Sequence, residues 1–171
     1  DSIKGQFIYA RPNFNYSDNT LFTSLKSSTT DLLTNSGYKT SNIGFSLGTK
    51  FEQFKNIYLS PEIDFLIEDL ETSDKASNIL KKQEGSYTDL YFNYSINQDL
   101  RDKRYRTEKG YITTFSQELP LVSDNAEISN AFEITNYKKL SSTSDMVGKV
   151  SFFGKTITGL SDDVRISKRL N

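Results

Sequence analysis

The chain has 171 residues, enough for one domain with a hydrophobic core, and its 21 basic and 22 acidic residues give a net charge of −1. This balance excludes a global basic field for nucleic acid. The absence of Cys and His excludes thiol nucleophiles, His general bases and zinc sites built on those residues. No apolar run reaches about 18 residues, so we expect no transmembrane helix. Because residue 1 is Asp, we expect a processed form or a fragment.

Hydrophobic side chains recur with a period of two along the chain, which is the period of β-strands. In residues 57–67, for example, Ile63, Phe65 and Ile67 share one face, whereas Glu62 and Asp64 share the other. In chain order the pattern predicts eight strands, at 2–10, 19–27, 42–49, 57–67, 88–97, 110–119, 126–135 and 146–155. Residues 73–82 are a short, poorly patterned helical candidate.

The predicted connections alternate in length. They are tight around 49–55 and 138–145, and longer and polar at 28–39 and 71–85. Short turns on one rim and long loops on the other are typical of a transmembrane β-barrel.

Two architectures explain the alternation of side chains. A soluble sandwich or lipocalin-like barrel would point its apolar face inward, whereas a membrane barrel would point the same face outward to lipid. Strand length favours the membrane barrel, since a tilted strand needs about nine to eleven residues to cross a bilayer. The expected lipid-facing residues include Leu90, Phe92, Ile96, Ile128, Phe132 and Ile134.

The other face would form a charged lumen, and aromatic residues near the strand ends would form girdles at the membrane interfaces. The expected lumen residues are Glu62, Asp64, Asp89, Glu118, Glu127, Glu133, Lys149 and Lys155, and the expected girdle residues are Tyr9, Phe51, Phe54, Tyr111 and Tyr137.

Three stretches resemble known motifs. "RPNFNYSDNTL" (11–21) is similar to an Asn-Pro-aromatic-aromatic turn, although Pro12 and Asn13 stand in the opposite order. "GFSLGTKFEQFKNIYLSPEIDF" (44–65) is similar to a strand, a short periplasmic turn and a second strand. "NQDLRDKRYRTEKGYITTFSQELP" (97–120) is similar to an Asp-x-x-x-x-Pro-Thr-x-x-Gly turn and the strand after it.

In their order and spacing these stretches resemble the barrel domain of the Omp85 superfamily (the bacterial surface antigen D15 domain), and its outer-membrane protein assembly factors in particular. Asp102, Thr107 and Gly110 are assigned to the periplasmic turn motif, with Arg106 where the family has Pro and with Asp102 one residue closer to that position than the motif's Asp. "VRISKRLN" (164–171) looks like the approach to the family's Arg-Gly-Phe loop motif.

The resemblance implies an all-β fold: an antiparallel transmembrane β-barrel of about eight strands over residues 1–171, forming a segment of a larger, 16-stranded barrel without POTRA domains. It implies folding and insertion of other barrel proteins into the bacterial outer membrane, without enzymatic activity or cofactors. The implied partners are outer-membrane lipids, unfolded outer-membrane proteins and assembly lipoproteins.

Two patterns invite other interpretations. The basic stretch 101–111 is a candidate nucleic-acid patch, but only Tyr105 could stack on a base, and a turn is the favoured interpretation. The lumen carboxylates could suggest paired acid/base catalysis, but a lumen network pairing with Lys26, Lys149 and Lys155 is favoured, and no metal site is expected.

Two alternatives to a barrel segment stay open from the sequence. The chain could close on itself as a small eight-stranded membrane barrel with a structural or adhesive role, in which case the first and last strands would pair. It could instead be a soluble ligand-binding barrel, in which case Leu90, Phe92 and Ile96 would point inward.

Overall fold

Eight antiparallel strands form a single sheet in the computed structural model, which describes residues 1–141 and 145–160. The strands follow one another in chain order, and each pairs with its sequence neighbours. They are β1 (Ser2–Arg11), β2 (Thr20–Leu32), β3 (Tyr38–Phe54), β4 (Ile57–Thr72), β5 (Gly85–Asp99), β6 (Gly110–Val122), β7 (Glu127–Lys139) and β8 (Val147–Gly159). All eight predicted strands are confirmed.

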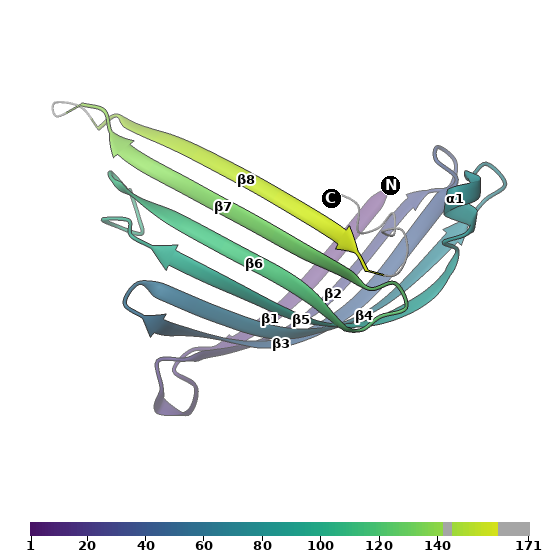
Figure 1. Ribbon diagram of the computed structural model, residues 1–171, viewed down its shortest axis with the longest axis horizontal. Helices are drawn as coiled ribbons and strands as arrows, with labels where there is room; N and C mark the ends of the chain where they lie inside the picture. Colours follow the sequence, from purple (N-terminus) through teal and green to yellow (C-terminus); the bar gives the residue numbers. More distant parts are fainter. Residues whose placement is uncertain (142–144, 161–171) are drawn as a thin grey trace.

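The sheet curls into an open trough with β1 and β8 at its two edges (Figure 1). Every ladder joins consecutive strands, and none joins β1 to β8 within the part of the chain that the structure describes. The described sheet is therefore a curved wall with two open edges rather than a closed eight-stranded barrel.

The two faces of the sheet differ in chemistry and in exposure. Ile63, Phe65 and Ile67 of β4 are 41%, 39% and 41% exposed, whereas Glu68, on the opposite face of the same strand, is 1% exposed. We call the apolar side the outer face and the polar side the inner face. A soluble domain buries its apolar face, so this sheet has the opposite arrangement.

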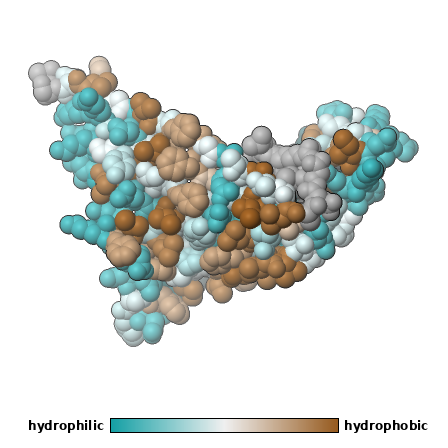
Figure 2. All heavy atoms as spheres, in the orientation of Figure 1, coloured by the Kyte–Doolittle hydropathy of each residue, from teal (hydrophilic) through white to brown (hydrophobic). Residues whose placement is uncertain are grey.

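Hydrophobic side chains gather in a band over the middle of the strands, and hydrophilic side chains gather toward the strand ends (Figure 2). The cross-strand register extends this band from strand to strand, as in the row of Phe45, Phe65 and Leu90. This is the arrangement expected where strands cross a lipid bilayer.

Small side chains allow close packing on the inner face. Phe22 of β2 lies over Gly48 of β3, where an added Cβ atom would fall 2.4 Å from Phe22 Cζ and 2.9 Å from the Pro61 carbonyl oxygen. Beside this contact, the buried hydroxyls of Ser24 and Ser46 are hydrogen bonded at 2.6 Å. The sequence therefore places glycine where an aromatic ring must lie against the sheet.

The connections lie on two rims. The first rim holds the turns 12–19, 55–56 and 100–109 and the described residues 140–141 and 145–146 of the β7–β8 connection. The second rim holds the turns 33–37, 73–84 and 123–126. The predicted alternation of short and long connections is wrong. The polar stretch 28–39 is mostly strand, since Ser28, Thr29 and Thr30 pair with Asn42, Ser41 and Thr40, and Thr suits the pleated sheet.

The helical candidate is reduced to one turn. Only Asn78–Lys81 (α1) is helical, and the Ser77 hydroxyl caps it by accepting a hydrogen bond from the Leu80 N–H at 3.3 Å. A short 3-10 turn (Phe14–Tyr16) lies in the first connection. Both helical pieces therefore lie in connections rather than against the sheet.

Candidate functional site: the two faces and the first rim

The predicted lipid-facing residues share the outer face. Leu90, Phe92 and Ile96 follow one another at every second or fourth position of β5, in register with Phe65, Ile63 and Leu59 of β4. This placement is opposite to the one that a soluble ligand-binding barrel requires.

The apolar face continues on β7, where Ile128, Phe132 and Ile134 lie on the side that pairs with Phe115 of β6 and Phe152 of β8. The rings of Phe132 and Phe152 lie 6.5 Å apart at an angle of 52°. Their tilted contact is a favourable aromatic geometry, and it holds two neighbouring strands in register on the outer surface.

A row of hydrogen-bonded polar side chains crosses this apolar face. The Tyr94 hydroxyl donates to Gln117 Oε1 at 3.0 Å, and Gln117 Nε2 donates to Asn130 Oδ1 at 2.6 Å. Sequence reasoning missed this row because the three residues lie on three different strands. Only the register shows that they pair.

The inner face buries carboxylates. Asp89, Glu68 and Glu127 are 0%, 1% and 1% exposed. The Tyr91 hydroxyl, itself on a residue that is 1% exposed, donates to Glu127 Oε1 at 3.2 Å, and the Ser123 hydroxyl donates to Asp89 Oδ1 at 2.6 Å. A hydroxyl donor therefore lies beside Glu127 and another beside Asp89, as buried charge requires. Glu68 was absent from the predicted lumen set.

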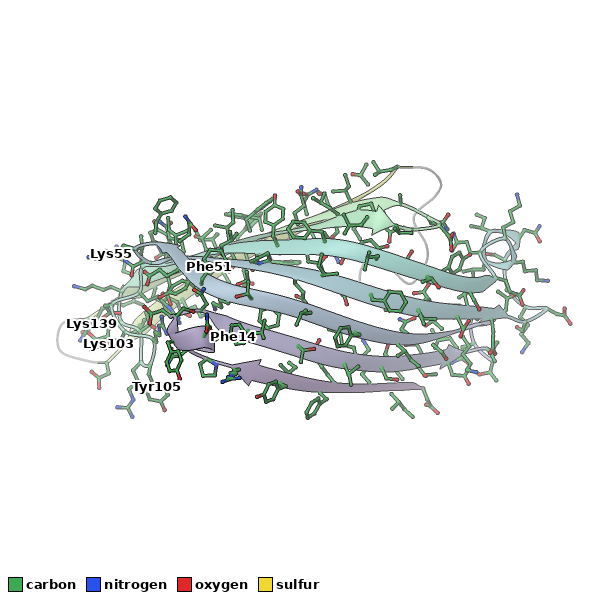
Figure 3. The ribbon with its side chains drawn as sticks, turned by 90° about the horizontal axis from the view of Figure 1, so that it is seen from below. Phe14, Phe51, Lys55, Lys103, Tyr105 and Lys139 are labelled. Carbon is green, nitrogen blue, oxygen red and sulfur yellow. The ribbon has the colours of Figure 1, made fainter. Side chains whose placement is uncertain are left out.

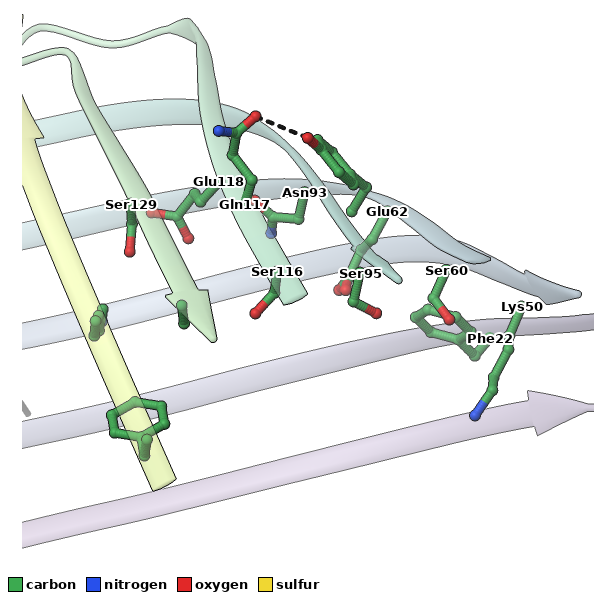
Figure 4. A pocket seen from close by; sticks show the side chains of 14 residues that line it. Phe22, Lys50, Ser60, Glu62, Asn93, Ser95, Ser116, Gln117, Glu118 and Ser129 are labelled. Atoms are coloured by element: carbon green, nitrogen blue, oxygen red, sulfur yellow. Dashed lines mark hydrogen bonds between the residues drawn. The ribbon is translucent and has the colours of Figure 1, made fainter. Parts of the chain in front are cut away.

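A polar hollow opens on the inner face (Figure 4). Its lining combines carboxylates, lysines and uncharged side chains. It includes Phe22, Lys50, Glu62, Asn93, Glu118, Ser129 and Lys155. Farther along the inner face, Lys26 Nζ lies 3.7 Å from Asp64 Oδ2, which confirms one of the predicted lumen pairs. The lining is hydrophilic and of mixed charge, which suits contact with water or with a passing polar segment.

The predicted turn motif is gathered in the connection between β5 and β6. Asp102 Oδ1 accepts hydrogen bonds from the backbone N–H groups of Glu108 (3.1 Å) and Lys109 (3.2 Å). The Thr107 hydroxyl donates to the Lys103 carbonyl oxygen at 2.7 Å. Gly110 has φ +101°, and an added Cβ atom would fall 2.2 Å from the Leu100 carbonyl oxygen. Each motif residue thus has a local structural role in the turn.

Arg106 has φ +54°. Proline is held near −65°, so it could not occupy this position in the present backbone conformation. The departure of Arg106 from the family's Pro is therefore accompanied by a left-handed backbone at that residue.

Charge stabilises the same turn. Glu108 accepts from Lys103 Nζ and Lys139 Nζ at 3.1 Å each, and these two hydrogen bonds lower the pKa of the Glu108 carboxyl. At Asp102 desolvation raises the pKa, but the hydrogen bonds from the backbone of Lys109 and Glu108 outweigh it, and the net shift is downward. Both carboxylates are therefore held in the ionised form.

The predicted girdle residues at the strand ends do not all lie on the same face of the sheet. Tyr9, Phe51 and Tyr111 lie in outer-face rows of the register, as a girdle requires. Tyr137 does not, because it pairs with Gly110 and Lys149 in an inner-face row, and its assignment to the girdle is wrong. A strand end near a rim can point either way, and only the register decides which.

Residues 164–171 lie outside the described residues. Within residues 1–141 and 145–160, no helix is long and apolar enough to cross a membrane. The same part of the chain contains no group of three or more acidic side chains placed to hold a metal ion.

A curved antiparallel wall with an apolar outer face, a polar inner face and open edges defines a segment of a transmembrane β-barrel. The family comparison is specific: residues 1–170 match the Omp85 superfamily domain, and the chain belongs to that superfamily.

A solved structure supports the same fold. The crystal structure of BamA from Haemophilus ducreyi lacking POTRA domains 1–3 superposes with a TM-score of 0.78 at 17% sequence identity. The alignment covers 94% of this chain and 34% of that one, so the chain spans about a third of the length of the solved protein. No curated protein matches the sequence.

Proposed function

We propose that this chain is a section of the barrel wall of a bacterial outer-membrane insertase, which folds and inserts other barrel proteins. The membership of residues 1–170 in the Omp85 superfamily carries the proposal. The activity belongs to the whole barrel, of which the chain is one segment.

The two faces suit that role. The outer face contacts the acyl chains of the membrane, so the wall stays anchored while clients are assembled. The inner face keeps polar groups and water along the lumen, where an unfolded client can be accommodated without burying its backbone in lipid. The chain does no covalent chemistry in this scheme and takes no cofactor.

The partners follow from the same surfaces. Outer-membrane lipids contact the outer face, and unfolded outer-membrane proteins enter at the polar lumen face. Assembly lipoproteins contact the periplasmic side. The turn with Asp102, Thr107 and Gly110 lies on that side, which makes the first rim periplasmic.

Depletion of the full-length protein tests the proposal. We expect the amounts of many other barrel proteins in the outer-membrane fraction to fall together, as measured by quantitative proteomics, while inner-membrane proteins stay constant. Unchanged amounts of barrel proteins would overturn the insertase role. Loss of a single secreted polypeptide with barrel proteins unchanged would point instead to export.

A further inference from the structure

The two rims of the wall differ in charge. The turns of the first rim, together with the four residues on either side of each turn, carry ten basic and six acidic side chains among the described residues. The same definition applied to the second rim gives four basic and seven acidic side chains. Although the net charge of the whole chain is close to zero, the first rim is therefore basic and the second rim is acidic.

Part of the basic charge is neutralised within the first rim. Arg101 forms a two-pronged pair with Asp99, with both nitrogen–oxygen distances at 2.8 Å, and Lys103 and Lys139 share Glu108. Arg104 donates to the Tyr58 hydroxyl at 3.0 Å, and its guanidinium lies 5.9 Å from the centre of that ring. These cations hold the turns together and face other protein groups.

Other cations of this rim lack such described partners. Arg106 and Lys149 are two of them, but Lys149 lies on the inner face and Arg106 shares its turn with Lys109, so three lysines mark the surface. Lys55, Lys109 and Lys138 are exposed, and the structure describes no ion pair or side-chain hydrogen bond for any of them. They come from three different elements: the β3–β4 turn, the β5–β6 turn and the end of β7. Lys138 lies on the outer face, since it follows Ile134 and Asn136 at every second position.

Exposed aromatic side chains accompany these lysines. Phe54 is 67% exposed and precedes Lys55, and Tyr105 is 83% exposed in the turn that holds Lys109. Phe14, Phe51, Lys55, Lys103, Tyr105 and Lys139 lie at the same end of the sheet (Figure 3). Aromatic rings beside cations at the edge of an apolar band are suited to the depth of lipid headgroups.

We propose that Lys55, Lys109 and Lys138 form a docking surface for acidic glycerophospholipid headgroups along the first rim. Each ammonium group reaches a headgroup phosphate, while Phe54 and the outer-face band contact the acyl chains below it. Charge complementarity supports this assignment. The first rim is basic and would attract acidic headgroups, whereas an acidic rim such as the second would repel them. The choice of glycerophospholipid as the anionic lipid rests on the periplasmic orientation within the proposed function.

Lipid retention by the full-length protein tests the docking surface. The purified protein in neutral detergent is titrated with phosphatidylglycerol or with phosphatidylcholine, and the bound lipids are counted by native mass spectrometry. The test variant carries Lys55→Gln, Lys109→Gln and Lys138→Gln. The control removes three exposed lysines from the second rim, with Lys75→Gln, Lys81→Gln and Lys82→Gln. Lys75 and Lys81 donate only to backbone carbonyl oxygens, so these substitutions break no described ion pair.

We expect the unchanged protein to prefer phosphatidylglycerol, and the test variant to lose about fivefold in that preference for each lysine that contributes at low salt. The control should keep the preference, and so should a variant with arginine at positions 55, 109 and 138. Equal losses in the test and control variants, or no loss in either, would overturn the proposal.

Two further anionic ligands test whether the surface selects phospholipid over other sources of negative charge. Stronger retention of diphosphorylated lipid A than of phosphatidylglycerol, lost in the test variant, would contradict the choice of phospholipid. Binding of a single-stranded oligonucleotide in place of lipid would also contradict it. Because the titration contains no assembly step, it can fail while depletion still removes barrel proteins, and it can succeed in a protein that is not an insertase.

Discussion

The outer and inner faces of this sheet share one backbone, yet they follow opposite rules. On the outer face, Ile63 and Phe65 are exposed, as the side chains of a lipid-facing surface are expected to be. On the inner face, Asp89 and Glu127 are buried beside hydroxyl partners. The comparison shows that exposure has no fixed meaning until the solvent on each side of a sheet is known. A side chain that would be a defect on one face is required on the other.

The largest expected effect comes from placing a charge on the wrong face. Phe92 and Asn93 are neighbours in the middle of β5 and point to opposite faces. We expect Phe92→Arg to destabilise the membrane-inserted barrel by about 2–4 kcal/mol, because the guanidinium enters the hydrocarbon region. Asn93→Arg is the matched control and should cost far less. Reversible unfolding of the full-length protein in lipid vesicles measures both, and equal losses would contradict the assignment of faces.

Alanine substitutions of glycine should give the next largest difference in stability between the two faces. Gly48→Ala on the inner face pushes a methyl group into Phe22 and the Pro61 carbonyl oxygen, and we expect a loss of about 1–3 kcal/mol from overpacking. Gly5 lies in an outer-face row of β1, and an added Cβ atom there meets nothing within 4 Å. Gly5→Ala should therefore leave the unfolding midpoint nearly unchanged. Adding Phe22→Leu to Gly48→Ala should recover part of the loss, and strict additivity would show that Phe22 is not the obstacle.

Removing a hydroxyl gives a smaller contrast between the faces. Tyr91→Phe deletes the hydrogen bond to a buried carboxylate on the inner face, where we expect a cost of about 1.5–3 kcal/mol. Tyr94→Phe deletes the bond to Gln117 on the outer face, where polar pairs inside a membrane average about 0.6 kcal/mol. Unfolding free energies in vesicles give both values, and a larger loss at Tyr94 would reverse the comparison.

Much of this organisation could be predicted from the sequence. Strict alternation over 57–67 and 88–97 determined which residues share a face, because the side-chain period of a strand is exactly two. Strand length and the carboxylates on the opposite face led to the prediction of which face meets lipid. Both are local properties, which a single segment reveals.

What the sequence could not show depends on register and turn geometry. The row of Tyr94, Gln117 and Asn130 exists because three strands align at one position, and the inner-face placement of Tyr137 has the same origin. Polar stretches such as 28–30 look like loops, yet their Thr and Ser side chains pair in the sheet. The left-handed conformation of Arg106 is likewise set by the closure of the whole turn.

The smallest effect concerns pH at the first rim, outside both faces. The lowered pKa of Glu108 means that its pairs with Lys103 and Lys139 contribute stability above the carboxyl's unfolded pKa. That contribution is lost as the pH falls through the lower folded value. An NMR titration of the Glu108 side-chain carboxyl should therefore show a midpoint below that of an unfolded peptide. The midpoint should return toward the peptide value when Lys103 and Lys139 are both changed to Gln, and an unshifted midpoint in the unchanged protein would contradict the pairing.

We infer that the outer face of the sheet contacts lipid and that the inner face contacts water. The chain has no cysteine, so single cysteines can be placed at each position from 62 to 67 of β4 and spin labelled in the membrane-embedded full-length protein. Collision with oxygen reports lipid, and collision with a water-soluble nickel complex reports water. We predict a period of two, with high oxygen accessibility at 63, 65 and 67 and high nickel accessibility at 62, 64 and 66. A uniform profile, or the same period with the two reagents exchanged, would contradict the account.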